Sequence, residues 1–311
     1  MSITTTESES RGSSGAERVS PAPVTVKDFK GKVDPDWCPG CGDFGVLVAL
    51  KQALVELDLR PHQVMVISGI GCSSNLPGFI NTYGMHTLHG RPLAVATGAQ
   101  LANHELKIIA TAGDGDGYGI GGNHFIHNMR RNVDLTYIVM NNQIYGLTTG
   151  QLSPTSVKGM KTKSTPFGSV ENPINPIPLA IAGGATYVAR GYTGQVKHLV
   201  ELIKGGIRHK GFALIDAFSP CVTFNFDNTH DFFKQRTKKL EEMGHDPTDF
   251  NAAMEKGYQW GEVIPIGLFW KRDDLAALDE LEPVLAEGGP LARRPLGVSP
   301  EVAQSLIREL M

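Results

Sequence analysis

The sequence predicts an α/β protein in which a mostly parallel sheet is flanked by helices, with a C-terminal arm. Short apolar runs of strand length alternate with longer segments of helical period along most of the chain. This alternation is typical of βαβ units, whose strands run parallel and are covered on both faces. A chain of 311 residues is also long enough to bury the core that such a sheet requires.

The expected elements follow from the periodicity of the apolar residues. Residues 43–59 are expected to form a helix, because apolar side chains from Val46 to Leu57 recur at helical spacing. Further helices are expected at residues 93–103, 120–132 and 194–204, and buried strands at residues 64–68, 107–112, 135–140, 186–189 and 212–217. Residues 146–178 are polar and rich in Pro, Thr and Lys, and a loop of this length is usually functional or disordered.

The chain is expected to have three segments. Residues 1–25 form a leader rich in Ser, Thr and Glu, which is expected to be disordered because it has little apolar surface to bury. Residues 26–229 form the α/β domain, which contains the candidate binding residues. Residues 230–311 form a C-terminal extension, which begins with an amphipathic helix at residues 232–243 and would pack on the body or on a partner.

Composition and charge argue against several classes of protein. Charged residues make up 20% of the chain and the net charge is −3, so no basic surface for nucleic acid is expected. No apolar run is long enough to span a membrane, and the N-terminus lacks the apolar region of a signal peptide. We therefore expect a cytoplasmic protein with no nucleic-acid or membrane partner.

Polar side chains and cysteines follow the expected ends of four strands. They lie in the segments 71–73, 113–115, 141–142 and 220–221. Ligands of open α/β sheets bind beyond the carboxyl ends of the strands, so the topology would bring these four loops toward one edge. The sequence therefore predicts a single binding region that contains two cysteines and an Asp/Asn pair.

The segment Gly113-Asp114-Gly115 has the features of a diphosphate site. It ends a strand and precedes a helix, whose N-terminus attracts an anion. The carboxylate of Asp114, the amide of Asn142 and the carbonyl of Ile144 would supply three oxygen ligands to Mg²⁺, leaving the other positions to phosphate and water. An Asp-Gly turn alone is common, and the acidic pattern also resembles the start of an EF-hand loop, but the downstream Glu is missing.

The four cysteines are Cys38, Cys41, Cys72 and Cys221. Disulfides are not expected in a reducing cytoplasm. The CxxC spacing of the first two could be a redox pair. Two clustered thiols and two from separate strand ends also suit a cubane iron–sulfur cluster. A structural zinc site and unligated thiols are the alternatives.

The chain resembles the β subunits of 2-oxoacid:ferredoxin oxidoreductases in four motifs, namely WCPGCG, GIGCSSNLPGF, HTLHGR and the run GDGDGYGIGGNHFIHNMRRNVDLTYIVMNNQIYGLTTGQ. In the last run, GDG followed by NN is similar to the motif that binds thiamine diphosphate. The resemblance covers roughly residues 36–229. It implies a thiamine diphosphate-binding fold that carries thiamine diphosphate, Mg²⁺ and one [4Fe–4S] cluster.

The resemblance also implies roles for individual residues. The Mg²⁺ ligands would be Asp114, Asn142 and the Ile144 carbonyl, and the cluster ligands would be Cys38, Cys41, Cys72 and Cys221. Contacts to thiamine diphosphate would come from Ile70, Gly71, Cys72, Ser73, His89, Gly115, Asp116, Gly146 and Leu147. Among the candidates for acid–base catalysis, His89 is favoured as functional and His86 as structural.

The implied reaction is the oxidative decarboxylation of a 2-oxoacid with coenzyme A to acyl-CoA and CO₂, with electrons passing through the cluster to ferredoxin. An α subunit would supply the Glu that activates the cofactor, so the chain should act only in an αβ or (αβ)₂ assembly. The favoured substrate is 2-oxoglutarate. Pyruvate or a broad range of 2-oxoacids is the alternative, because Asn75 and Thr149 are neutral where some family members carry Lys.

Two further alternatives come from other classes. One is a thiamine enzyme of the decarboxylase or acetohydroxyacid synthase kind, although such chains are much longer than this one. The other is an iron–sulfur electron carrier with a vestigial thiamine fold, against which the intact Asp114 and Asn142 pair argues.

Overall fold

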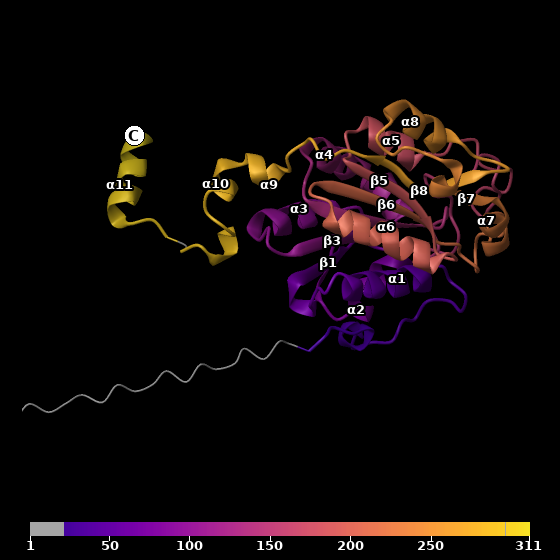
Figure 1. The fold of residues 1–311 in the computed structure, drawn as a ribbon, viewed down its shortest axis with the longest axis horizontal. Helices are drawn as coiled ribbons and strands as arrows, with labels where there is room; N and C mark the ends of the chain where they lie inside the picture. The colour runs from indigo at the N-terminus through magenta and orange to yellow at the C-terminus, as the bar shows by residue number, and fades with distance from the viewer. Residues whose placement is uncertain (1–21, 296) are drawn as a thin grey trace, which may run out of the picture.

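The computed structural model describes residues 22–295 and 297–311. Its centre is a sheet of eight strands in the order β2-β1-β3-β4-β6-β5-β8-β7 (Figure 1). The strands are β1 (Val64–Ser68), β2 (Tyr83–His86), β3 (Lys107–Gly113), β4 (Leu135–Asn141), β5 (Tyr187–Tyr192), β6 (Phe212–Phe218), β7 (Thr237–Lys239) and β8 (Ile264–Lys271). The strands from β2 to β5 in this order pair in parallel, β8 is antiparallel to β5, and β7 is parallel to β8. The prediction of a mostly parallel sheet is therefore confirmed.

Helices cover both faces of the sheet. The helices are α1 (Asp43–Glu56), α2 (Leu76–Phe79), α3 (Pro92–Ala102), α4 (Gly122–Arg131), α5 (Pro176–Ala182), α6 (Val196–Arg208), α7 (His230–Arg236), α8 (Phe250–Tyr258), α9 (Leu278–Leu281), α10 (Pro283–Ala286) and α11 (Pro300–Glu309). A π-helical turn, η4 (Gly115–Ile120), lies between β3 and α4. No described helix is long and apolar enough to cross a membrane.

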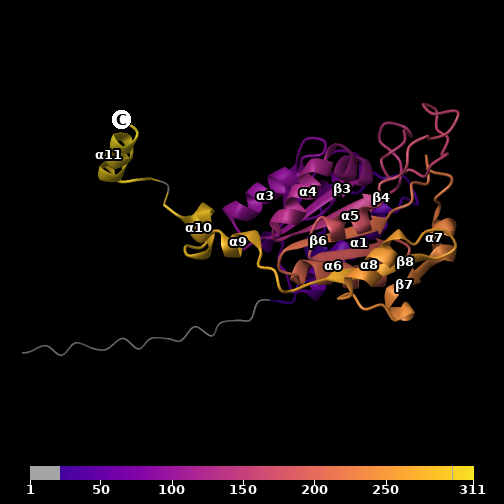
Figure 2. The ribbon, with the colours of Figure 1, turned by 90° about the horizontal axis from the view of Figure 1, so that it is seen from above.

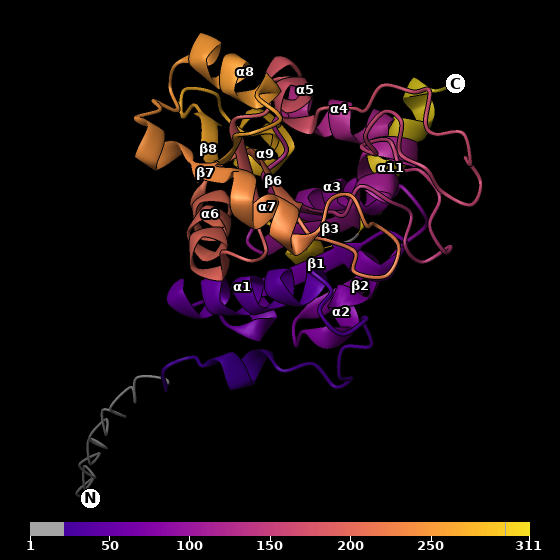
Figure 3. The ribbon, with the colours of Figure 1, turned by 90° about the vertical axis from the view of Figure 1, so that its right-hand side faces the viewer.

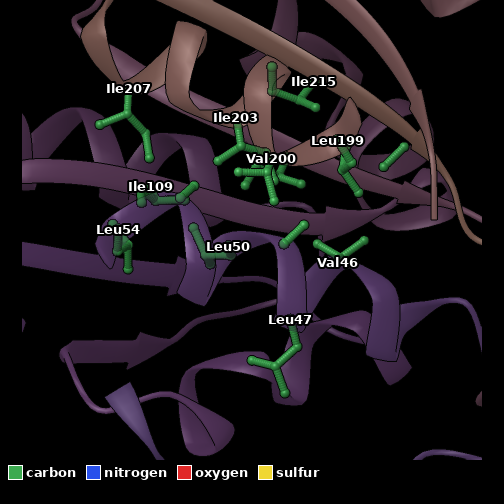
Figure 4. Packing of buried hydrophobic residues seen from close by; sticks show 14 of the residues in the cluster. Val46, Leu47, Leu50, Leu54, Ile109, Leu199, Val200, Ile203, Ile207 and Ile215 are labelled. Atoms are coloured by element: carbon green, nitrogen blue, oxygen red, sulfur yellow. The ribbon is translucent and has the colours of Figure 1, made fainter. Parts of the chain in front are cut away.

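Alternation along the strands divides the core into two layers. Ile109 of β3 faces α1 and α6, where it packs with Leu50 and Ile203 (Figure 4). Its neighbour Ala110 faces the other layer, which contains Phe125 of α4 and residues of α3 and α5. The two helical layers lie on opposite sides of the sheet (Figure 3). Burial on both faces explains why the central strands read as continuous apolar runs.

Residues 230–311 take part in the sheet before they leave it. The strands β7 and β8 extend the sheet beyond β5, and α8 packs beside α5. The segment from α9 to the 3₁₀ turn η6 (Leu291–Arg293) contacts the body, where Asp279 pairs with Lys210 and Arg293 pairs with Glu105. The chain then extends away from the body and ends in α11 (Figures 1 and 2). The leader expected at residues 1–25 lies outside the described residues, except for its last four positions.

One sequence expectation about local structure is wrong, and another differs from the structure by two residues at its start. The helix expected at residues 232–243 is α7, which ends at Arg236, and the chain then forms β7 as a partner of β8. Tertiary strand pairing therefore overrides local helix preference there. The helix expected from residue 120 is preceded by the π-helical turn, and α4 itself begins at Gly122.

Candidate cofactor site

The loops that follow β1, β2, β3 and β4 surround a cavity of about 110 Å³, which we call the GDG cavity. Every residue predicted to contact thiamine diphosphate or Mg²⁺ lines it. These are Ile70, Gly71, Cys72, Ser73, His89, Asp114, Gly115, Asp116, Asn142, Ile144, Gly146 and Leu147. The predicted residues therefore lie close together beyond the carboxyl ends of the parallel strands, as the topology argument expected.

Asp114 is a buried carboxylate at the floor of the GDG cavity. It follows β3 directly, and its Oδ2 accepts a hydrogen bond of 2.6 Å from the hydroxyl of Thr155. Burial raises the pKa of Asp114 to about 6, while hydrogen bonds from Ser153 and Thr155 act in the opposite direction. A divalent cation beside this carboxylate would favour its charged form, so the residue fits the role of a Mg²⁺ ligand.

Asn142 and Ile144 are brought together by a tight turn after β4. The Oδ1 atom of Asn142 accepts a hydrogen bond of 3.1 Å from the backbone N–H of Ile144. Between them, Gln143 has a φ of 58°, in the left-handed region. The turn places Asn142 and Ile144 at the same cavity. This donor set suits Mg²⁺, which prefers oxygen ligands.

Asp116 joins three segments of the site. Its Oδ1 lies 2.6 Å from Nδ1 of His89 and accepts hydrogen bonds from the backbone N–H groups of Gly90 (2.6 Å) and Ile70 (3.1 Å). A Cβ on Gly69 would lie 1.9 Å from Oδ2 of Asp116, so only glycine allows the carboxylate this approach. Asp116 therefore holds the loops after β1 and β2 against the π-helical turn.

The two candidate histidines differ in their surroundings. His89 lines the GDG cavity, and its Nδ1 is turned toward Asp116. His86 does not line this cavity; its Nδ1 lies 2.9 Å from the Ser68 hydroxyl and 3.1 Å from the Ser74 carbonyl. His89 therefore lies at the candidate site and His86 outside it, while their functional and structural roles stay predictions.

A second cavity, of about 270 Å³, is lined by all four cysteines, and we call it the thiol cavity. Two hydrogen bonds hold its walls together. Nε1 of Trp37 donates to the carbonyl of Cys72 at 2.6 Å, and the N–H of Gly42 donates to the carbonyl of Pro220 at 3.1 Å. Cysteines that are distant in the sequence are therefore brought to one place by contacts of their neighbours.

The environment of the thiols bears on which cofactor could bind them. Burial is the main cause that raises the pKa of Cys41 and of Cys72, and the nearby carboxylate of Asp43 is the second cause. The pKa of Cys72 rises to about 11. Iron or zinc would supply the positive charge that thiolates need here. Among the described residues, no three His, Cys, Asp or Glu side chains lie close enough together to hold a single ion.

All four thiols line one cavity, and four thiolates are the donor set of a cubane cluster, in which each thiolate binds a separate iron atom. Zinc would instead gather its sulfur ligands at about 2.3 Å around one centre. The choice of a cluster over zinc stays a prediction.

The two cavities share a wall. Cys72, Asn142, Gly146 and Leu147 line both of them. A Cβ on Gly146 would lie 3.7 Å from Sγ of Cys221 and 3.8 Å from Sγ of Cys72. The GDG cavity and the thiols are therefore separated by single residues, and a glycine keeps the space between them open.

Sequence reasoning missed Thr155 and Trp37. Thr155 lies in the long polar loop after β4, and nothing in its local sequence distinguishes it from the other threonines there. Asn75 and Thr149, the neutral positions noted in the sequence, both line the thiol cavity. The described residues that line the GDG and thiol cavities include no lysine or arginine.

Comparisons with known proteins identify the family of the chain. The family model "Thiamine pyrophosphate enzyme, C-terminal TPP binding domain" matches residues 62–217, and the model for the C-terminal part of the "Pyruvate ferredoxin oxidoreductase beta subunit" matches residues 221–287. The β subunit of 2-oxoacid:ferredoxin oxidoreductase 1 from Aeropyrum pernix is 49% identical over 255 residues, which cover 79% of this chain and 80% of that protein.

Two further relatives bear on the substrate. A 2-oxoglutarate oxidoreductase subunit KorB from Mycobacterium tuberculosis is 46% identical over 203 residues, covering 65% of this chain and 54% of that protein. A solved structure of 2-oxoglutarate:ferredoxin oxidoreductase from Magnetococcus marinus, with 2-oxoglutarate, coenzyme A and succinyl-CoA bound, has a TM-score of 0.84 and 44% identity. It covers 91% of this chain and 96% of that chain.

The fold and the site define a thiamine diphosphate-binding domain of the type found in thiamine enzymes. Within that class, the chain belongs to the β subunits of the 2-oxoacid:ferredoxin oxidoreductases and is part of an oxidoreductase. The predictions of the family, the fold and the kind of enzyme are confirmed.

Proposed function

We propose that this chain holds the diphosphate end of thiamine diphosphate, through Mg²⁺, beside a [4Fe–4S] cluster. The enzyme would decarboxylate 2-oxoglutarate oxidatively with coenzyme A, releasing CO₂ and an acyl-CoA, and would pass the electrons to ferredoxin. The single observation that carries the proposal is the wall of Cys72, Asn142, Gly146 and Leu147 that the GDG and thiol cavities share. It would place a decarboxylating cofactor next to an electron acceptor.

The chain's own residues would bind and orient the cofactors. Asp114, Asn142 and the Ile144 carbonyl would hold Mg²⁺, and Cys38, Cys41, Cys72 and Cys221 would hold the cluster. Asp116 would keep the loops around the diphosphate in place through its three hydrogen bonds. Thiamine diphosphate, when bound, supplies the carbon that adds to the keto group of the substrate, while the protein supplies placement and electrostatics.

The proposed substrate has a second carboxylate that needs a cationic partner. Because neither cavity has a lysine or arginine among its described lining residues, this cation would come from the α subunit. The KorB relatives and the structure with 2-oxoglutarate bound favour 2-oxoglutarate. The neutral Asn75 and Thr149, and relatives named for 2-oxoacids in general, keep pyruvate or a broad range as the second candidate.

The proposed working unit is a cytoplasmic αβ or (αβ)₂ assembly. The chain's relatives are named as subunits, which supports a partner chain. The α subunit would also supply the Glu that activates the cofactor, since the residues lining the GDG cavity include no glutamate in the described part of the chain. The chain without its α subunit should therefore be inactive.

The test is anaerobic co-purification of the chain with its α subunit, followed by a substrate panel. Reduction of ferredoxin should require coenzyme A and should be fastest with 2-oxoglutarate. A preference for pyruvate would support the second candidate and contradict the first. Calorimetry separates the enzyme from an electron carrier with a vestigial thiamine fold: if thiamine diphosphate with Mg²⁺ does not bind the complex, the carrier is correct.

A further inference from the structure

A third cavity, which we call the Arg190 cavity, lies beyond the carboxyl ends of β4, β5 and β6. Its volume is about 460 Å³, within the range of about 300–1,000 Å³ that is typical of small-molecule sites. The polar loop after Asn142 and the end of α8 enclose it. Thr155 separates it from the GDG cavity, because this residue lines the Arg190 cavity while its hydroxyl contacts Asp114.

The floor of this cavity holds an arginine whose hydrogen bonds are incomplete. Arg190 is 2% exposed; its Nε donates to Oδ2 of Asp216 at 3.4 Å and its Nη2 to Oδ1 of Asn175 at 3.2 Å. Its Nη1 is buried and has no partner among the described residues. An unpaired buried donor is costly, so an acceptor in the cavity would stabilise this side chain.

The neighbours of Arg190 leave part of its charge available. Asp216 also accepts hydrogen bonds of 3.0 Å from the Tyr118 hydroxyl and the Asn141 amide, so its charge is shared among three donors. The guanidinium carbon lies 5.2 Å and 5.3 Å from the ring centres of Phe218 and Phe269. Because these rings lie near the guanidinium group, an acceptor would approach it along its planar edge. The two oxygens of a carboxylate match the donors on that edge.

A second buried polar group faces the same space. Gln143 lines the Arg190 cavity and is 4% exposed. Its Nε2 donates to the carbonyl of Thr155 at 3.1 Å, whereas its Oε1 has no partner within the described part of the chain. Two residues that line the cavity therefore each have a buried polar atom without a partner among the described residues, namely the Nη1 donor of Arg190 and the Oε1 acceptor of Gln143.

The rim of the cavity is aromatic and open to solvent. Tyr258 and Trp260 are 65% and 42% exposed, and Val157 and Ile174 add aliphatic surface. Lys158 adds a positive charge at the rim, where its Nζ donates to Asn172. Flat aromatic bodies pack well between such side chains.

We propose that the Arg190 cavity binds a small aromatic carboxylic acid, with its carboxylate on Arg190 and its ring between Tyr258 and Trp260. This site is separate from the cofactor site and does not depend on the activity proposed above. Its occupant would lie one residue, Thr155, away from Asp114.

The test uses the complex of this chain with its α subunit, saturated with thiamine diphosphate and Mg²⁺. The probes are benzoate and indole-3-carboxylate, each compared with its neutral amide by isothermal calorimetry. At least one acid should bind saturably, and at least tenfold more tightly than its amide. If neither acid binds saturably, or if the amides bind as tightly as the acids, the proposal is wrong.

Variants locate the binding. Trp260→Ala should weaken binding at least tenfold. Phe250→Ala is the control, because it removes an exposed aromatic side chain at the other end of α8, outside the cavity, and should leave binding unchanged.

Arg190→Gln should abolish the preference for the acid over the amide. If this variant does not fold, Gln143→Leu tests the floor independently: it should weaken binding of indole-3-carboxylate, whose ring N–H can donate to Oε1, more than binding of benzoate, which has no donor. Unchanged binding in Trp260→Ala, or a partner side chain filling the cavity in a structure of the complex, would overturn the proposal.

Discussion

The hydroxyl of Thr155 lies 2.6 Å from Oδ2 of Asp114 and 3.0 Å from Oδ1 of Asn141. All three side chains are buried. Because a hydroxyl has a single hydrogen, the anionic carboxylate is its favoured acceptor. A residue of the long loop after β4 therefore orients the carboxylate that is proposed to bind Mg²⁺.

The first prediction concerns this contact. Thr155→Val keeps the shape of the side chain and removes the hydroxyl, so Asp114 loses a hydrogen bond to a charged group, worth about 1.5–3 kcal/mol. The affinity for thiamine diphosphate in the presence of Mg²⁺ should fall by roughly tenfold or more, as measured by calorimetry on the αβ complex. Thr162→Val, in the same loop but away from both cavities, serves as the control. Equal affinities in the two variants would show that Thr155 does not position the ligand.

The second prediction concerns Asp116. Asp116→Asn replaces a carboxylate that accepts three hydrogen bonds by an amide whose NH₂ group would face donors. The loops at residues 70–73 and 87–90 should exchange their amide hydrogens faster, and cofactor affinity should fall. The control is Asp58→Asn at an exposed turn with a φ of 51°, which asparagine tolerates. Unchanged exchange in both loops would contradict the role assigned to Asp116.

The third prediction concerns the cysteines. Cys72→Ser should remove most of the iron from the anaerobically purified complex. The absorbance at about 400 nm, which is typical of iron–sulfur clusters, should fall with it. Iron content, measured with the yield of folded complex, is the readout. The control is Thr223→Ser, which alters the lining of the same cavity without removing a thiol. Full iron content in Cys72→Ser, or zinc in the unaltered protein, would argue against the cluster.

The fourth prediction concerns the core. Leu50→Ala should lower the free energy of unfolding by about 2–5 kcal/mol, because Leu50 is fully buried between α1 and the sheet and its truncation leaves a cavity. Val48→Ala, on the exposed side of the same helix, should change it by less than about 0.5 kcal/mol. Chemical denaturation followed by circular dichroism measures both variants. A similar loss in the two would mean that the burial pattern of α1 is wrong.

The central strands could be predicted closely because their sequences carry their own signal. Residues 64–68 were expected as a strand and form β1, and the strand expected at 135–140 is β4, with one more residue. The strand β8 could not be predicted in this way. It contains Pro265 and Gly267, residues that are disfavoured inside strands. Its place beside β5 is decided by pairing with a strand that lies far away in the sequence.

The sequence by itself singled out the residues that are proposed to carry the chemistry of this protein: the GDG and NN segments, the CxxC pair and the two later cysteines. The alternation of strands and helices was enough to predict that the GDG and NN segments and the two later cysteines meet at one edge of the sheet. Only the tertiary structure decided how they meet. Trp37 reaches Cys72, Asp116 joins three loops, and Thr155 reaches Asp114 from a loop without regular structure. The physical reason is that periodicity encodes which face of an element is buried, whereas contacts between distant loops depend on the packing of the whole chain.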